Sequence, residues 1–136
     1  WQNISSTSSL RATTAELQDA AERGGQPPLL IATDQEGGAV KRLASAPPYE
    51  SALQLGASGN SARARAAALA TGRSLRAVGV NVDLAPVLDV ASSRRSFLGS
   101  RTFGSDPATV ARVRVAFANG LEAAGVAATA KALGKK

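Results

Sequence analysis

Long amphipathic segments alternate with short apolar runs along the chain, and this alternation predicts an α/β fold. Residues 7–23 open with capping residues and place Leu10, Leu17 and Ala21 on one stripe, which predicts a helix. After two glycines and two prolines, the apolar run 29–33 is predicted to be a fully buried strand.

The same order of helix, glycine and strand occurs twice more. Residues 60–78 predict a second helix, and a strand follows from Val80. Asp106 and Pro107 predict the start of a third helix, and the run 126–131 is the third predicted strand. Helices alternating with buried strands predict a parallel sheet with right-handed crossovers.

Long polar segments, 34–59 and 85–104, follow the first two strands, whereas the segments before the strands are short. Parallel sheets place their binding sites at the carboxyl ends of the strands, so we expect the site there. Four groups fall on this rim: Asp34 with Gln35-Glu36-Gly37-Gly38, Asp83 with Asp89, Arg101, and Lys131.

Carboxylates and cations that meet at one rim can hydrogen-bond a polyhydroxylated ligand. Asp34 would accept from neighbouring hydroxyls, while Arg101 and Lys131 would donate to the same oxygens. Gly37 and Gly38 would let the backbone come close to that ligand. In the structural alternative, which stays open, Asp34 only caps a turn and the glycines only form a tight bend.

The other rim groups have structural interpretations too. Asp83 and Asp89 are typical of side chains that bond local backbone amides, and Asp106 is typical of a residue at a helix start. Arg101 could simply pair with a carboxylate across the rim, and Lys131 could belong to a frayed terminus.

Composition narrows the chemistry. The 136 residues are one domain's worth of chain, 44% hydrophobic and 4% aromatic, so we expect a core of small aliphatic side chains. With no Cys and no His, disulfides, thiolate metal sites and Ser-His-Asp or Cys-His centres are excluded. We expect neither a metal nor a cofactor. No apolar run approaches the ~20 residues that span a bilayer.

The net charge of +6 raises the possibility of a nucleic-acid or phosphate partner. The arginines of residues 63–76 are spread through an Ala-rich helical segment, as on a solvated face, and no aromatics are interleaved to stack on bases. The stretch GASGNSA, residues 56–62, precedes a helix but lacks the Lys-Ser/Thr of a phosphate-binding loop. We therefore expect no nucleic-acid partner.

Four runs, taken in order, carry a family resemblance. LLIATDQEGGAVKRL, VGVNVDLAPVLDV, GSRTFGSDP and GLEAAGVAATAK together resemble glycoside hydrolase family 3, in its bacterial β-N-acetylhexosaminidase branch, over residues 3–131. The resemblance implies a (β/α)8 TIM barrel and a retaining glycosidase that removes N-acetylglucosamine from cell-wall fragments. It also implies that Asp34, Arg101 and Lys131 bind the terminal sugar.

The chain departs from that family after Lys131. The family continues Lys-His-Phe-Pro-Gly and then carries an acid/base pair and a later nucleophile, whereas this chain continues with residues 132–136, ALGKK. The resemblance therefore implies that residues 1–136 form a partial barrel domain of about three strands without catalytic residues. The segment would supply sugar-binding groups to a glycosidase; the alternative is a non-catalytic carbohydrate-binding or structural fragment.

Three expectations concern the surroundings of such a piece. Its open sheet edges would favour self-association. Its partner would be an N-acetylglucosamine-containing carbohydrate. Because Trp1 is not an initiator residue, we expect the natural start to be missing, which leaves the bacterial cytoplasm and export both open as the location.

Overall fold

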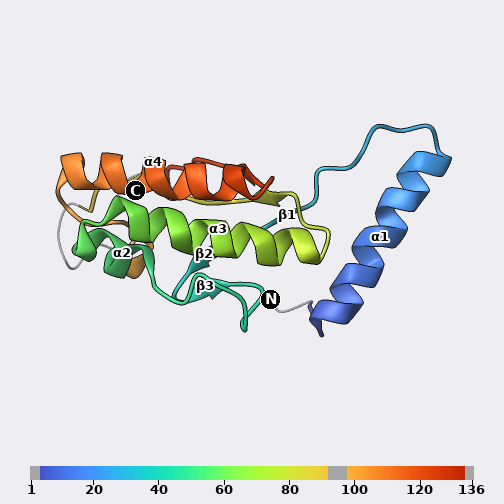
Figure 1. Cartoon of the computed structure of the whole chain (residues 1–136), viewed down its shortest axis with the longest axis horizontal. Coiled ribbons are helices and arrows are strands. Elements are labelled where there is room, and N and C mark those ends of the chain that lie inside the picture. The colour runs from blue at the N-terminus through green and yellow to red at the C-terminus, as the bar shows by residue number, and fades with distance from the viewer. Residues whose placement is uncertain (1–3, 92–97, 134–136) are drawn as a thin grey trace.

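The structure is a computed structural model that describes residues 4–91 and 98–133, and its centre is a parallel three-stranded sheet (Figure 1). The strand order is β1-β4-β5, with every pairing parallel. The predicted α/β class with covering helices is confirmed. The strands are β1 (Ala32–Thr33), β4 (Val82–Asp83) and β5 (Ala127–Ala128), and the long helices are α1 (Thr7–Arg23), α3 (Ser61–Ala77) and α4 (Pro107–Ala123).

Helices α3 and α4 lie side by side and cover one face of the sheet (Figure 1). Their shared core is aliphatic apart from two packed phenylalanine rings, Phe103 and Phe117. Close approach depends on Gly120 in α4, because a Cβ there would lie 2.7 Å from the Cβ of Ala68 in α3. The expected core of small aliphatic side chains is therefore largely confirmed.

The predicted helix starts are confirmed by their capping bonds. Asp106 accepts a hydrogen bond of 2.9 Å from the backbone N–H of Thr109, and Pro107 occupies the first turn of α4. Asn60 accepts from the backbone N–H of Arg63 at 3.0 Å and so caps α3. The stretch 56–62 is thus the junction of two helices, with a side chain already bonded at the second helix start.

The expectation of a fully buried strand over residues 29–33 is wrong. Only Ala32 and Thr33 form β1, and the side chain of Leu30 is 82% exposed. The reason is that β1 is the edge strand and the helices cover only one face of the sheet. Helix α1 lies at an angle beside the end of α3 (Figure 1) and contacts it there, where Thr14 Oγ1 donates to the Val78 carbonyl at 2.8 Å. Leu17 on its predicted apolar stripe is about half exposed.

The two strands predicted from Val80 and over 126–131 are also shorter than expected. Their pairing continues past β4 and β5 through an isolated parallel bridge between Val87 and Lys131. The two chain segments therefore stay paired in parallel as far as Lys131, although the regular strands end earlier.

The segment 34–59, predicted to be a long polar loop, contains regular structure. It forms the antiparallel pair β2 (Gln35–Gly37) and β3 (Val40–Lys41), followed by α2 (Ala52–Ser58). Gly37 and Gly38 take φ values of 102° and 56° and turn the chain between the two strands. The segment 85–104 contains one short 3-10 helix, η1 (Gly99–Arg101), among its described residues.

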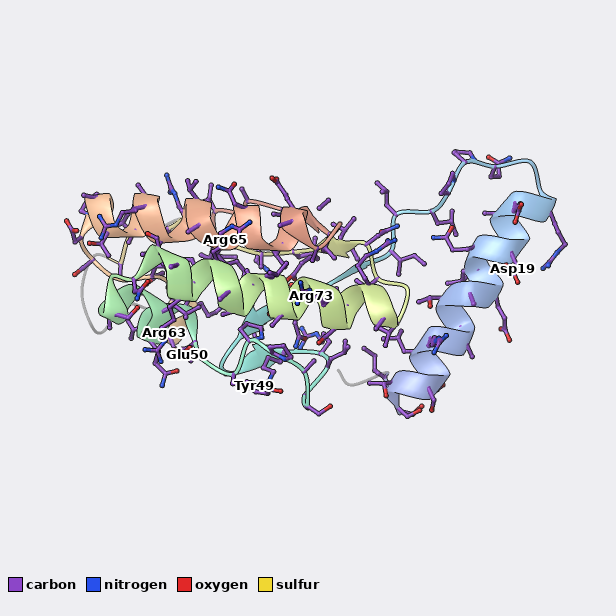
Figure 2. The ribbon with its side chains drawn as sticks, viewed as in Figure 1. Asp19, Tyr49, Glu50, Arg63, Arg65 and Arg73 are labelled. Carbon is purple, nitrogen blue, oxygen red and sulfur yellow. The ribbon has the colours of Figure 1, made fainter. Side chains whose placement is uncertain are left out.

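Basic side chains project from α3 into solvent. Arg63, Arg65 and Arg73 are exposed along the helix, and Arg63 pairs with Glu50 at 2.6 Å (Figure 2). This spread is the solvated face that the sequence predicts; the absence of a nucleic-acid partner remains a prediction. Among the helices described, none is long and apolar enough to cross a membrane.

Candidate functional site

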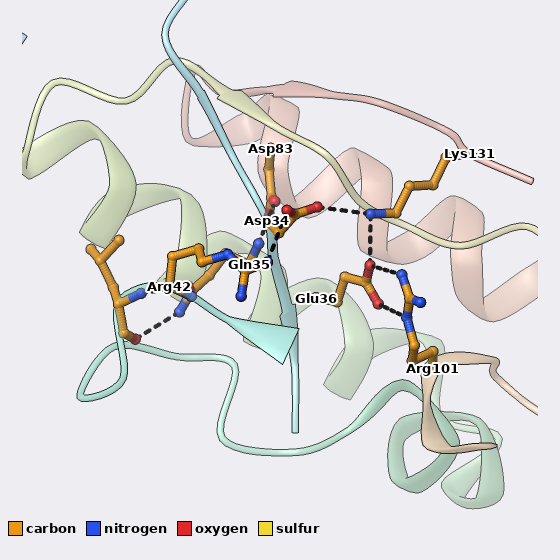
Figure 3. Close-up of polar contacts among 8 residues, drawn as sticks. Asp34, Gln35, Glu36, Arg42, Asp83, Arg101 and Lys131 are labelled. Carbon is orange, nitrogen blue, oxygen red and sulfur yellow. Dashed lines mark hydrogen bonds and ion pairs between the residues drawn. The ribbon is translucent and has the colours of Figure 1, made fainter. Parts of the chain in front are cut away.

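Three strands bring charged residues from distant parts of the chain to one rim (Figure 3). Asp34 follows β1 directly, Asp83 ends β4, and Lys131 lies just beyond β5. The backbone of Lys131 is fixed by two hydrogen bonds: its N–H donates to the Pro86 carbonyl at 3.1 Å, and its carbonyl accepts from Leu88 N–H at 2.8 Å. The parallel sheet thereby fixes the backbone positions from which these side chains extend.

Lys131 and Arg101 bind the two acidic residues of the Asp-Gln-Glu run. The Nζ of Lys131 lies 3.0 Å from Asp34 Oδ1 and 2.6 Å from Glu36 Oε1. Arg101 donates to Glu36 with two groups, Nη2 to Oε1 at 2.8 Å and Nε to Oε2 at 2.9 Å. This bidentate pair with Glu36 raises the pKa of Arg101.

A further cation approaches from the hairpin. Nη2 of Arg42, just after β3, lies 3.4 Å from Asp34 Oδ2, so Asp34 has a cation on each carboxylate oxygen. Gln35 fixes this hairpin, because its Oε1 accepts from the backbone N–H of Arg42 and Leu43 at 3.0 Å each. Its Nε2 donates to the carbonyls of Leu43 and Pro47 at 3.0 Å each.

Exposure separates the acidic residues of the rim. The Asp34 side chain is 30% exposed, and those of Arg101 and Lys131 are 34% and 21% exposed. The Glu36 side chain is only 4% exposed. Asp34, Arg101 and Lys131 therefore combine fixed positions with access from solvent, which is what hydrogen bonding to a ligand's hydroxyls requires.

Asp83 lies beneath this layer and is fully buried. Its Oδ1 accepts from the backbone N–H of Gln35 at 3.0 Å, while its Oδ2 has no hydrogen-bond partner among the described residues. Burial raises the pKa of Asp83 from 3.8 to about 7; the Gln35 bond and Lys131 oppose the shift, and the charges of Asp34 and Glu36 add to it.

The rim therefore brings together Asp34, Arg101 and Lys131 as the sequence predicts; their binding role remains a prediction. Arg101 does pair with a carboxylate, that of Glu36, and whether this is its whole role stays as open as in the sequence. Asp83 and Asp89 do bond backbone amides, Asp89 that of Leu133 at 2.7 Å, but the amides belong to distant segments instead of local ones.

Sequence reasoning placed Glu36 in the rim group of Asp34 without giving it a role, and it missed Arg42. Glu36 stands two positions after Asp34, and that spacing in a strand places both side chains on one face. The backbone of the glycine pair lies close to another segment of the chain, because a Cβ on Gly38 would lie 2.8 Å from the Cβ of Ser51. The interpretation of the glycines as a tight bend is confirmed.

The described residues offer no metal site. Within residues 4–91 and 98–133, no group of three or more His, Cys, Asp or Glu could hold a metal ion. What the rim offers is a set of oxygen acceptors and N–H donors, which suits an uncharged polar ligand with several hydroxyls.

Comparisons with known proteins give matches over most of the chain. Residues 2–133 match the family described as "Glycosyl hydrolase family 3 N terminal domain". The chain is 38% identical over 126 residues to "Beta-hexosaminidase LpqI" of Mycobacterium tuberculosis, covering 90% of this chain and 32% of that protein. It is 36% identical over 134 residues to a "Beta-hexosaminidase" of Methylococcus capsulatus, covering 96% of this chain and 39% of that protein.

A solved structure shares the fold. The family 3 β-N-acetylglucosaminidase from Paenibacillus sp. superimposes with a TM-score of 0.86 at 37% identity, over 95% of this chain and 25% of that one. The chain thus spans about a third of the two curated relatives and a quarter of this solved structure.

Proposed function

Because the chain belongs to the glycoside hydrolase family 3 N-terminal domain, we propose that its protein is a retaining β-N-acetylglucosaminidase acting on cell-wall-type glycans. In this proposal residues 1–136 form a partial barrel domain that supplies sugar-binding groups. One observation carries it: Asp34, Arg101 and Lys131 converge, partly exposed, at the carboxyl end of the parallel sheet.

Each side chain has a distinct role in holding the sugar. The Asp34 carboxylate accepts hydrogen bonds from neighbouring hydroxyls of the terminal ring, because it is partly exposed whereas Glu36 and Asp83 are buried. Lys131 and Arg101 donate their remaining N–H groups to the oxygens of the same ring. A ligand held in this way loses a fixed set of bonds when its hydroxyls are inverted or removed, which gives specificity.

The catalytic carboxyl groups come from outside the described residues. A retaining glycosidase needs two carboxyl groups about 5 Å apart on either side of the bond. At this rim Asp34 and Glu36 are both bonded to Lys131, and Asp83 is buried under them. In this proposal Asp34 binds the sugar and the two buried carboxyl groups organise the rim, so none of the three supplies the acid or the nucleophile.

The same observation supports a second candidate function. If the protein at its full natural length holds no acid/base group and no nucleophile, the rim binds carbohydrate without cleaving it. Sugar affinity would then be present and turnover absent, so a turnover measurement separates the two candidates.

The test is hydrolysis of a fluorogenic β-N-acetylglucosaminide by the protein at its full natural length, with the intact mass measured on the same sample. We expect turnover, and we expect Asp34→Asn to lower kcat/KM by roughly tenfold to a hundredfold through loss of charged hydrogen bonds. Asp19→Asn, on the exposed side of α1, is the matched control and should leave kcat/KM unchanged (Figure 2).

Two results would contradict the proposal. Sugar binding without turnover at full natural length would leave only the non-catalytic candidate. Turnover by residues 1–136 alone, at the mass of 13.7 kDa, would mean that groups in this segment perform the chemistry.

A further inference from the structure

Among the rim side chains that form ion pairs (Asp34, Glu36, Arg42, Arg101 and Lys131), Glu36 has the least solvent access and makes the shortest pair. Its Oε1 lies 2.6 Å from Lys131 Nζ and accepts from Nη2 of Arg101 at 2.8 Å, and its Oε2 accepts from Nε of Arg101 at 2.9 Å (Figure 3). Only 4% of the side chain is exposed. A carboxylate bonded on both oxygens and closed to solvent has no face left for a ligand.

The two cations that Glu36 holds still have N–H groups to offer. Arg101 uses its Nε and Nη2 side for Glu36, so the Nη1 side of the guanidinium remains to donate. Lys131 divides two N–H groups between Asp34 and Glu36, which leaves a further one. The bonds to Glu36 thus determine which N–H groups of Arg101 and Lys131 remain available to a ligand.

We propose that Glu36 is the positioning residue of the rim: its buried carboxylate aims Arg101 and Lys131 at a sugar that it does not touch. This inference rests on the proposed function, because it takes the terminal sugar as the ligand of those two cations. It assigns to the Glu of the Asp-Gln-Glu run a role different from that of Asp34, although both carboxylates bond the same lysine.

The chemistry of the pair explains why a glutamate is needed. A guanidinium held through Nε and Nη2 by one carboxylate has a fixed plane, whereas a single bond would leave it free to rotate. Removing the charge with an amide replaces one acceptor oxygen by a donor NH₂ that faces a cation. Arg101 and Lys131 would then turn toward Asp34 or solvent, and the sugar would lose its donors.

The test is the affinity for N-acetylglucosamine, measured by calorimetry with the protein at its full natural length. We expect Glu36→Gln to weaken binding on the order of tenfold. The matched control is Glu50→Gln, which removes the charge of a glutamate paired with Arg63 and not with a rim cation, and which should leave affinity unchanged.

A double-mutant cycle distinguishes positioning from a general loss of structure. If Glu36 acts through Arg101, its replacement by Gln should cost much less affinity once Arg101 is already Ala. Equal costs in both backgrounds would overturn the proposal, as would wild-type affinity in Glu36→Gln. Wild-type protein that binds no N-acetylglucosamine would instead overturn the proposed function.

A second measurement keeps the inference testable if Glu36→Gln does not fold or if the wild type binds no sugar. The Nε–H of Arg101 is bonded to Glu36, so its proton resonance should exchange slowly with solvent in the wild-type protein. Fast exchange of that proton in the folded wild type would show that the pair does not hold, and the positioning role would fall.

Discussion

At the scale of single residues, the titration of Asp83 makes the free energy of unfolding of the chain depend on pH. Its pKa is raised to about 7 in the folded chain, against an ordinary value of 3.8. Between these values the folded state keeps a proton that the unfolded state has lost. The free energy of unfolding therefore falls as pH rises from about 4 to 7, with a slope approaching 1.4 kcal/mol per pH unit, and levels off above.

Asp83→Asn should remove that slope. The amide oxygen can still accept from the Gln35 N–H, and the NH₂ group takes the place of the protonated oxygen without titrating. Urea unfolding at a series of pH values between 4 and 8 measures the effect. An unchanged slope in the variant would mean that Asp83 is not the titrating group; Asp19→Asn serves as the exposed control.

How far single residues were predictable depends on where their partners lie. Asp34 and Lys131 were placed correctly, because Asp34 follows one predicted strand, Lys131 ends another, and the carboxyl ends of parallel strands meet. The role of Glu36 was not visible, because its partner Arg101 comes from a segment 65 residues away. No local pattern tells the exposed Asp34 from the buried Glu36.

At the scale of elements, the fit of α3 against α4 depends on a buried glycine. Gly120 lies in α4 with Ala68 of α3 at 2.7 Å from where its Cβ would be, and the backbone of Arg65 lies closer still. Alanine normally favours a helix by about 1 kcal/mol over glycine. Here the added methyl has no space, so overpacking opposes that gain.

Gly120→Ala should therefore lower the free energy of unfolding, by about 1–3 kcal/mol, instead of raising it. Urea unfolding gives the value. The matched control is Asn119→Ala, one position away and exposed, which should be neutral or slightly stabilising. A stabilised Gly120→Ala variant would show that the two helices do not pack as closely as the structure describes.

The elements themselves were predictable to different degrees. The three long helices were found, because their capping residues and apolar spacing are local signals. The β2–β3 pair and α2 were missed, because Gln35 organises that segment through side-chain bonds to backbone groups that no periodicity records. The strands were predicted too long, since an apolar run does not reveal which face a sheet leaves uncovered.

At the scale of the whole molecule, the sheet has one covered and one open face. Leu30 beside the edge strand β1 is 82% exposed, and β1 pairs with β4 on one side only. Open parallel edges and uncovered apolar side chains favour association with other chains. Self-association remains a prediction from the sequence, and this surface is where we expect it to occur.

Residues 1–136 expressed alone should therefore form oligomers at micromolar concentration, measured by light scattering after size-exclusion chromatography. Leu30→Asp should raise the monomer fraction by placing a charge on the open face. Leu17→Asp, on the half-exposed stripe of α1, is the control and should change it little. A wild-type segment that stays monomeric across the concentration range would contradict this account.

The most direct test of the sugar-binding rim is a crystal structure of the protein at full natural length with N-acetylglucosamine bound. We expect hydroxyls of the ring within hydrogen-bond distance of the Asp34 carboxylate and of Arg101 or Lys131, with Glu36 touching the two cations and not the sugar. A ring bound elsewhere, or one bonded directly to Glu36 with Arg101 turned away, would rule out the sugar-binding rim.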